Sequence, residues 1–511
     1  MTYAFEGASR RGLMMMAAAA GVGLTVPNLA RAAAGGFGGD LTDVKSAIDK
    51  LQPQAIKRLQ DWIALPTISA EHRNVQEGPV YMQNLLKEAG FQTTSIIPTD
   101  GTPGVFGVMD NGAKRTVGMY FMYDVKQFDP AEWMSPPLEG RIIDRPGLGK
   151  VLIGRGATNQ KGPEAAFLAA LHALKASGRK LPVNIVLVAE GEEEIASPHF
   201  PQIVRRPEVL AALAKCKEVW MPMNMQSTSG GVQVDLGAKG VIEVELTCSN
   251  KAWGRGSAVD IHSSYKAELD SPVWRMIKAL NTLVSEDGND PAIDGWFEHV
   301  KPLTARQKEI IADEAARVPE AEVKKTLSVQ HWVRDLPYRE ALERLASQPT
   351  ANIEGMYAGY TGPGGKTLLP SKAVVKMDFR LVPDQTAKEA EEKLKAHLAK
   401  RGFGDIDVNV TGGYNPTQTD EHSALIQSSI AVYKANGLDV SLSPRLAGSW
   451  PGYIFTDAPV GLPAGHFGLG HGSGAHAPNE YFVIESSVPK LRGMAGATLG
   501  YVEFLYALAA G

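Results

Sequence analysis

The side chains best suited to chemistry in this 511-residue chain are carboxylates that follow apolar segments. Asp124 follows the apolar run 119–123, and the acidic segment 190–194 comes shortly after a second apolar run, residues 183–188. Carboxylates that share a site repel one another, so at least one of them acquires a raised pKa. A carboxyl group with a raised pKa can act as a general acid or base. The pattern therefore predicts proton-transfer chemistry near these two segments.

The order of the surrounding segments predicts an open α/β sheet. The two apolar runs are nearly continuous, which is typical of strands covered on both faces. Between them, residues 163–177 have helical periodicity, and Pro163 suits the first turn of a helix. The glycine-rich segment 154–163 precedes that helix. A β-loop-α-β order gathers such loops at one edge of the sheet, where we expect the site.

A second region begins near Gly240. Residues 241–246 and 373–380 alternate between apolar and polar side chains, as half-exposed strands do. Thr386 and Glu389 have the spacing that opens a helix with a capping box. One-sided strands with helices between them predict a small α+β domain inserted into the larger one. The expected organisation is a larger domain in two parts, residues 41–239 and 413–511, with the inserted domain at residues 240–412.

Composition and the first residues restrict the function further. The net charge is -4 and basic residues are scattered, so neither favours nucleic-acid binding. Residues 9–14 contain two consecutive arginines before an apolar run that ends in small residues. That pattern is typical of a twin-arginine export signal. A membrane anchor is the alternative, but Pro27 interrupts the run and it is shorter than the ~20 residues of a span. We expect residues 1–34 to be a signal peptide and the mature protein to be soluble and periplasmic, binding neither nucleic acid nor membrane.

Only Cys216 and Cys248 are available for a disulfide. An oxidising compartment permits the bond, but two cysteines in a chain of this size are more often buried apolar side chains. The sequence leaves both alternatives open.

Taken together, the ordered motifs resemble those of the M20 family of metallopeptidases and deacylases, most closely its dipeptidase branch. The motifs that carry the resemblance, besides the segments above, are residues 133–138, 359–363, 366–370, 379–385 and 476–480. The resemblance implies a zinc-exopeptidase-like α/β catalytic domain and an inserted, ferredoxin-like α+β domain that serves as lid and dimerisation domain. It also implies a homodimer and hydrolysis of an amide bond by two zinc ions that share a bridging aspartate.

Position by position, the resemblance carries the family's metal ligands onto this sequence. The bridging aspartate falls on Asn159, and the other two ligands of one zinc ion fall on Met122 and Asn224. The remaining ligands fall on Glu194 and His476. Thioether and neutral amide groups suit zinc poorly beside imidazole and carboxylate. The resemblance thus implies one vacant metal position and a second that holds at most one zinc ion, through Glu194, His476 and weakly Asn159, or none.

Other matched positions bear on catalysis. Glu193 falls on the family's proton-transferring base, and Asp124 on the aspartate near the first metal. Lys126 shares a face with Asp124 in an extended segment, so its ammonium either partly replaces a missing cation or lies at the surface. His262 resembles a lid histidine that reaches into the partner subunit's site to hold the oxyanion. Without that motif it would be an ordinary core or surface histidine.

Three residues resemble those that bind the substrate carboxylate in the family: Arg380, Thr367 and Ser449. A guanidinium fork suits a carboxylate. The alternation alone is equally compatible with an outward-facing Arg380, and Ser449 alone with a turn serine. Three histidines outside the matched positions are interpreted as structural: His199, His466 and His471.

The leading functional hypothesis is hydrolysis of an amide bond in a small dipeptide or N-acyl amino acid with a free carboxylate. Glu193 would be the base, with at most one metal ion. One alternative is a metal-independent isomerase, cyclase or lyase that uses Glu193 and His262. Another is an inactive homologue that only binds the small molecule, although such a protein needs neither residue. A serine hydrolase is disfavoured because no G-x-S-x-G motif follows a strand.

Overall fold

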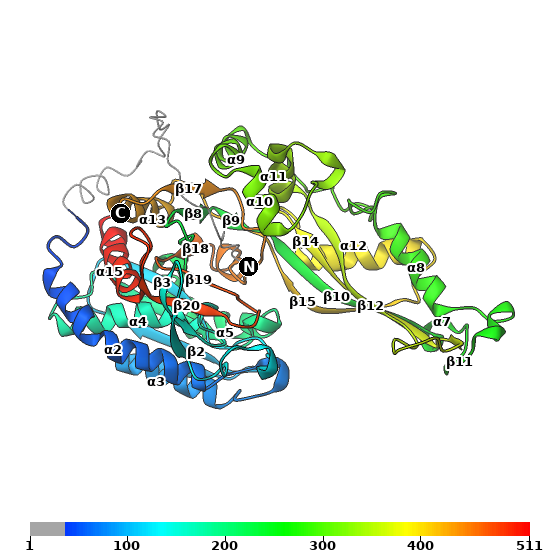
Figure 1. Ribbon diagram of the computed structural model, residues 1–511, viewed down its shortest axis with the longest axis horizontal. Coiled ribbons are helices and arrows are strands. Elements are labelled where there is room, and N and C mark those ends of the chain that lie inside the picture. The colour runs from blue at the N-terminus through cyan, green and yellow to red at the C-terminus, as the bar shows by residue number, and fades with distance from the viewer. Residues whose placement is uncertain (1–35) are drawn as a thin grey trace.

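The computed structural model describes residues 36–511 and divides them into two lobes (Figure 1). A globular lobe contains both ends of the described chain, and an elongated lobe contains its middle. The expected signal peptide, residues 1–34, lies outside the described residues. Across residues 36–511, no helix combines the length and the apolar character that crossing a membrane requires.

A six-stranded mixed sheet forms the centre of the globular lobe, with the order β1-β2-β6-β3-β7-β18. The strands are β1 Thr93–Ile97, β2 Gly104–Met109, β3 Thr116–Met122, β6 Asn184–Glu190, β7 Cys216–Pro222 and β18 Ala464–Phe467. The last four strands in this order are parallel, whereas β1 and β2 are antiparallel to their neighbours. The carboxyl ends of β3 and β6 therefore meet at one edge, with Met122 opposite Glu190.

Helices cover both faces of this sheet. One face packs against α2 Thr42–Ala64, α3 Glu77–Ala89, α4 Lys161–Ala176, α13 Ala424–Ala435 and α15 Met494–Ala510. The other face packs against α5 Phe200–Val204, α6 Pro207–Leu213 and α14 Tyr453–Thr456. Successive β3 residues alternate between the two cores, so Phe121 lies in the first and Met122 in the second. The predicted strands covered on both faces are confirmed.

Three smaller sheets join the first part of the globular lobe to its last part. A four-stranded sheet has the order β19-β20-β5-β4, and two pairs are β17 with β8 and β16 with β9. Their bounds are β4 Arg141–Arg145, β5 Gly149–Ile153, β8 Val232–Asp235, β9 Gly237–Ala238, β16 Thr417–Gln418, β17 Val440–Ser443, β19 Gly472–Ser473 and β20 Tyr481–Ser486. Strands distant in sequence, such as β5 and β20, are thus held side by side.

The elongated lobe contains a four-stranded antiparallel sheet with the order β12-β14-β10-β15, and α8 and α12 pack on it. The elements are β10 Gly240–Ser249, α8 Pro272–Leu283, β12 Thr350–Tyr357, β14 Lys372–Leu381, α12 Ala387–Lys400 and β15 Asp407–Tyr414. Thr386 caps α12, since its Oγ1 accepts the Glu389 N–H at 3.1 Å. The expected fold class, an α/β catalytic domain with an α+β lid, is confirmed.

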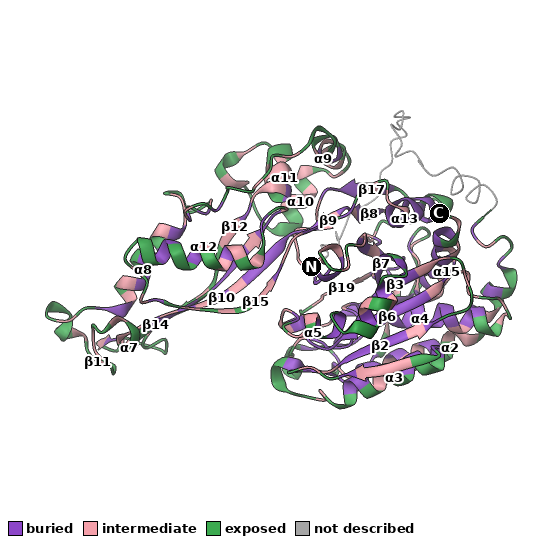
Figure 2. Ribbon diagram, turned by 180° about the vertical axis from the view of Figure 1, so that it is seen from behind, coloured by how far each residue is buried: buried purple, intermediate pink, exposed green. Residues whose placement is uncertain are grey.

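The tip of the lid lies at the end farthest from the globular lobe (Figure 1). It contains α7 Asn250–Trp253 and the strand pair β11 Ile261–His262 with β13 Leu368–Leu369. Figure 2 shows that burial follows the strands of the globular lobe, whereas the tip is largely exposed. Cys216 lies in a core of the globular lobe and Cys248 in the core of the lid, and both are free thiols.

A helical insertion in the lid contacts the globular lobe. It consists of α9 Ala305–Arg317, α10 Glu320–Leu327 and α11 Tyr338–Ser347. Ile310 of α9 belongs to the main core of the globular lobe. At the end of the insertion, Arg445 donates to the carbonyl of Ala346 and Lys239 to that of Gln348, both at 2.7 Å. The insertion therefore braces the two lobes against each other.

Two carboxyl groups, one in the insertion and one in β8 of the globular lobe, oppose folding when they ionise. Burial raises the pKa of Glu314 in α9 to about 7, with a contribution from the charge of Asp235, and burial raises the pKa of Asp235 to about 6. Groups with raised folded-state pKa values favour folding at acidic pH, and that contribution is lost as the pH rises through those values. The Glu314→Gln variant should therefore lose less thermal stability than the wild type between about pH 5 and about pH 8. Circular dichroism melts measure this, and Asp313→Asn, an exposed change on the same helix, is the control. Equal losses in the wild type and Glu314→Gln would contradict the prediction.

Candidate active site

The glycine-rich loop between β5 and α4 is held by one buried carboxylate, that of Glu480. Its Oε1 accepts the N–H groups of Thr158 and Asn159, both at 2.8 Å. Its Oε2 accepts the N–H of Gly156 at 2.9 Å and the Arg155 guanidinium at 2.8 Å. Gly156 has φ +88°, a conformation that favours glycine. The carboxylate thus fixes the backbone that presents the Asn159 side chain.

Asn159 lies between Glu194 and His476. Its Nδ2 donates to Oε1 of Glu194 at 2.6 Å and lies 3.1 Å from Nε2 of His476. The same His476 nitrogen is 3.0 Å from Oε2 of Glu194. Nζ of Lys126 lies 3.6 Å from that oxygen and also donates to the backbone carbonyl of Glu194. The structure brings these four side chains into one group, which we call the Glu194 cluster.

Asp124 supports the turn η3 (Glu193–Ile195), which carries Glu193 and Glu194. The fully buried carboxylate accepts the N–H of Glu193 at 3.2 Å and that of Glu194 at 3.0 Å. Burial and then the charge of Glu194 raise the pKa of Asp124 to about 8. Burial and the charges of Glu194 and Asp124 also raise the pKa of Glu193 well above its usual range. Glu193 therefore keeps a proton more readily than an ordinary carboxyl group, which suits a general acid or base.

The other two residues matched to metal ligands, Met122 and Asn224, lie in different surroundings. Met122 is buried in an apolar core with Tyr120 and Met221. Asn224 donates through Nδ2 to Oγ1 of Thr158 at 2.9 Å. Its Oδ1 is buried and accepts no hydrogen bond from any residue in the described part of the chain.

The three residues expected to bind the substrate carboxylate lie in two different parts of the structure. Arg380 of β14 reaches the globular lobe, where its Nη1 donates to Oγ of Ser449 at 3.3 Å, and its Nε donates to Asp378 at 2.7 Å. Thr367 lies at the tip of the lid instead, with its Oγ1 3.2 Å from Nε2 of His262. His262 is exposed and belongs to β11, which lies far from β3 and β6 (Figure 2).

A buried polar chain was missed by sequence reasoning. Oε1 of Glu190 accepts from the hydroxyls of Tyr120 at 2.9 Å and Ser197 at 2.8 Å. The hydroxyl of Tyr414, at the end of the lid strand β15, lies 3.0 Å from Oγ of Ser197 and donates to the carbonyl of Glu193 at 3.2 Å. The lid therefore touches the backbone of the candidate base. No local signal marks Tyr414 because its partners lie far away in the sequence.

The three histidines interpreted as structural make contacts away from the Glu194 cluster. His199 pairs with Glu192 at 2.8 Å, His466 stacks on Trp450 with ring centroids 4.5 Å apart, and His471 lies 2.8 Å from the Gln226 carbonyl and 3.1 Å from the Tyr481 hydroxyl.

Comparison with known proteins decides the family. The sequence model described as Peptidase family M20/M25/M40 matches residues 123–499. The chain belongs to this family. The resemblance inferred from its motifs is confirmed, and the chain is an amide or peptide hydrolase by class.

Several characterised proteins are similar to this M20 peptidase over most of their length. Cys-Gly metallodipeptidase DUG1 of Saccharomyces cerevisiae is 25% identical over 503 residues, covering 91% of this chain and 98% of the relative. Beta-Ala-His dipeptidase of Homo sapiens is 27% identical over 407 residues, covering 74% and 76%. The crystal structure of the M20 family metallo-carboxypeptidase Sso-CP2 from Sulfolobus solfataricus has a TM-score of 0.76 at 29% identity and covers 89% of this chain and 99% of that one.

The names of two of these relatives describe metal-dependent enzymes, but the donors in this M20 peptidase do not fit a pair of zinc ions. Zinc in proteins is bound by thiolate, imidazole and carboxylate groups. Among the five matched positions, only Glu194 and His476 offer such groups. Both already face the Asn159 amide, whose N–H is a hydrogen-bond donor and not a ligand. We therefore assign no catalytic step to a metal pair.

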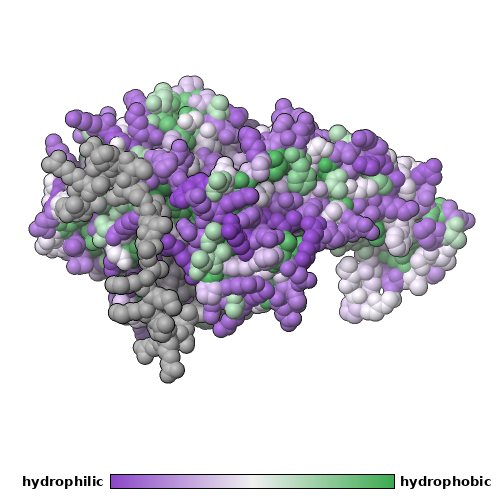
Figure 3. Space-filling model, turned by 90° about the horizontal axis from the view of Figure 1, so that it is seen from above, coloured by the Kyte–Doolittle hydropathy of each residue, from purple (hydrophilic) through white to green (hydrophobic). Residues whose placement is uncertain are grey.

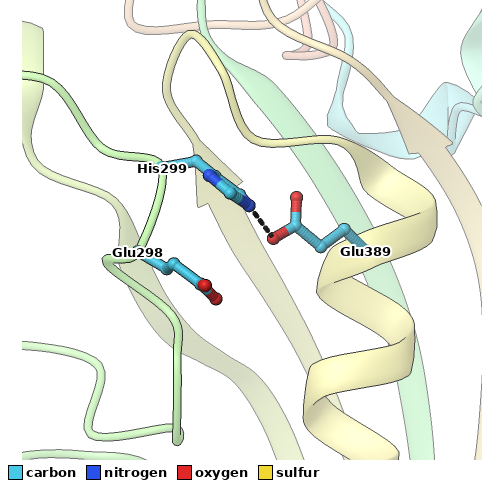
Figure 4. A group of neighbouring side chains, drawn as sticks. All are labelled: Glu298, His299 and Glu389. Carbon is cyan, nitrogen blue, oxygen red and sulfur yellow. Dashed lines mark ion pairs between the residues drawn. The ribbon is translucent and has the colours of Figure 1, made fainter.

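Within residues 36–511, one group of three acidic or histidine side chains has the spacing to hold a metal ion, and it lies in the lid: Glu298, His299 and Glu389. Figure 4 shows the His299 ring pointing toward Glu389 of α12, and these groups are 3.4 Å apart. Nζ of Lys393 lies 2.5 Å from Glu389 and 3.4 Å from Glu298. This ammonium already balances the two carboxylates, so the group is a surface ion-pair network.

The role of Glu480 in fixing the loop predicts a large effect of its charge on stability. In Glu480→Gln, the nearly fully buried Arg155 guanidinium loses its counter-charge. We expect a loss of about 3–5 kcal/mol of unfolding free energy, as for other buried ion pairs that lose one partner. Urea unfolding measures it. Glu485→Gln is the control, because its pair with Lys150 is exposed and should cost less than about 1 kcal/mol. Similar losses in both variants would contradict the anchoring role.

Proposed function

We propose that this protein hydrolyses the amide bond of a small dipeptide or N-acyl amino acid that carries a free carboxylate, with Glu193 as general base and at most one metal ion. The observation that carries the proposal is the setting of Glu193. Its backbone is held by Asp124 and its pKa is raised by burial and by neighbouring carboxylates, which suits proton transfer. The similarity to two enzymes named as dipeptidases supports a small substrate.

In this proposal the described residues have distinct tasks. Glu193 removes a proton from water as the water attacks the carbonyl carbon, and then passes that proton to the leaving amine. Asp124 positions the turn that carries Glu193. Arg380 and Ser449, which adjoin across the two lobes, bind the substrate carboxylate. A single ion at Glu194, His476 and weakly Asn159 would polarise the carbonyl when bound.

A metal-independent isomerase, cyclase or lyase is the second candidate. It is favoured by the contacts of Glu194, whose carboxylate oxygens already face Asn159, His476 and Lys126. It would use the same proton carrier, Glu193, together with His262.

We further propose that the protein acts as a homodimer. His262 and Thr367 lie at the tip of the lid, remote from Glu193 in the same chain, so a histidine that holds the oxyanion has to come from a second chain. The surface seen in Figure 3 is mostly hydrophilic. The lid nevertheless exposes large apolar side chains on α8 and on the edge strand β12, including Trp274 at 60% and Ile353 at 54% exposure. Such surfaces are suited to burial against a partner.

We also propose export to the periplasm. The proposal depends on the two arginines within residues 9–14 and on the small residues near position 34. Neither the net charge of -4 nor the scattered basic residues favour nucleic acid as a partner.

The Glu193→Gln variant tests the proposed base. Removing the base should lower kcat about 10²- to 10⁴-fold while KM changes little, because Gln keeps the shape but cannot take a proton. Steady-state kinetics on a panel of dipeptides and N-acyl amino acids measure this, and the same substrates with an amidated carboxyl group test the need for a free carboxylate. Wild-type rates in the Gln variant would exclude Glu193 as base, and release of product without hydrolysis would favour the second candidate.

Subunit mixing tests the role of His262. Glu193→Gln and His262→Ala chains should each have low activity, and mixed dimers should regain part of it, because one of their two sites then has both residues intact. Hydrolysis is measured after the two variants are refolded together, with each variant refolded alone as the control. No gain on mixing would mean that His262 acts within its own chain or not at all.

A further inference from the structure

We propose that the ammonium group of Lys126 is the built-in cation of the Glu194 cluster, where it takes the electrostatic place of a metal ion and opposes the binding of a divalent ion to Glu194 and His476. The inference deepens the proposed function, because it names the positive charge of the same site.

The contacts of Lys126 show that the ammonium belongs to the cluster. Nζ lies 3.6 Å from Oε2 of Glu194 and donates to the backbone carbonyl of the same residue. The side chain of Lys126 is 35% exposed and that of Glu194 only 5%, so the ammonium covers a nearly buried carboxylate. Water screens such a pair less than it screens a pair on the open surface.

The backbone places Lys126 for this contact. The chain stays extended beyond β3, where Asp124 forms a bridge with Thr67 and the N–H of Val125 donates to the carbonyl of Thr67 at 2.9 Å. In an extended segment, Asp124 and Lys126 point to the same side. Asp124 takes the N–H groups of Glu193 and Glu194, and Lys126 takes the carbonyl of Glu194. The carboxylate of Asp124 thus binds N–H groups of the turn, and the ammonium of Lys126 binds one of its carbonyl groups.

The side-chain amide of Asn159 is complementary to the negative charge of Glu194. Its N–H group donates to Glu194 at 2.6 Å, where an aspartate would place a second negative charge against that carboxylate. His476 occupies the other oxygen at 3.0 Å. Within residues 36–511, the three groups that face the Glu194 carboxylate therefore each present nitrogen, from an amide, an imidazole and an ammonium. A metal ion would have to displace Lys126 and turn the Asn159 amide.

Met122 points to the same conclusion independently. The residue is buried in an apolar core and offers a thioether in place of an imidazole. A zinc ion needs several coordinating side chains, whereas a lysine ammonium needs only hydrogen-bond acceptors. The backbone carbonyl and the carboxylate of Glu194 provide them.

Zinc titration of full-length, metal-stripped protein by calorimetry tests the proposal. The wild type and Lys126→Arg should bind zinc weakly. Lys126→Gln keeps a donor for the carbonyl but removes the charge, so it should bind zinc at least about tenfold more tightly, because a neighbouring positive charge no longer repels the ion. Lys180→Met, an exposed change outside the cluster, should match the wild type.

A double variant locates the binding. Adding Glu194→Gln to Lys126→Gln should abolish the gain in zinc affinity, and a gain that persists would place the ion elsewhere and overturn the proposal. Equal zinc affinity in the wild type, Lys126→Arg and Lys126→Gln would also overturn it, as would two tightly bound zinc ions in the wild type. The readout is zinc binding and not turnover, so failure to hydrolyse any dipeptide would refute the proposed function without touching this result.

Discussion

The geometry of the site depends on one carboxylate that joins two distant parts of the chain. Glu480 receives four hydrogen bonds, three from the backbone of the glycine-rich loop and one from Arg155. The loop itself has no regular secondary structure, so its own backbone cannot fix the direction of Asn159. Because Glu480 immediately precedes β20, which pairs with β5, the same sheet that joins the two parts of the globular lobe also sets the position of the anchor.

A second constraint acts on the turn that carries Glu193 and Glu194. Asp124 accepts the N–H groups of Glu193 and Glu194, so a neighbouring carboxylate orients the backbone of the candidate base. The arrangement is costly, because it gathers three carboxyl groups in a place of low solvent access. The raised pKa values of Asp124 and Glu193 are the physical result of burial and of mutual repulsion. Positive charge next to Glu194 lowers that cost, whichever cation supplies it.

The periodicity of the sequence predicted much of the fold. It could not predict contacts between residues that are distant in the sequence. The continuous apolar runs became β3 and β6, and the alternating runs became β10 and β14. Motif order located the residues around Asn159, but position alone left Lys126 either in the site or at the surface. That choice depends on η3 lying beside the end of β3, which no local pattern encodes. Two other features also depend on contacts between distant residues. The Tyr414 hydroxyl donates to the Glu193 carbonyl, and Thr367 and Arg380 lie in different parts of the lid.

The helical insertion explains why the distance between Arg380 and His262 bears on the proposed dimer. Ile310 packs into the main core, and hydrogen bonds from Lys239 and Arg445 hold the end of the insertion, so the lid is attached to the globular lobe at its base. Arg380 lies near that base and can reach Ser449, whereas His262 lies at the opposite end of the same lobe. A lobe braced at one end cannot bring its other end to Glu193 of the same chain without breaking these contacts. Arg380 and Ser449, the proposed carboxylate-binding pair, thus lie in the same chain as the candidate base, whereas the proposed oxyanion donor, His262, would serve the site of a neighbouring chain.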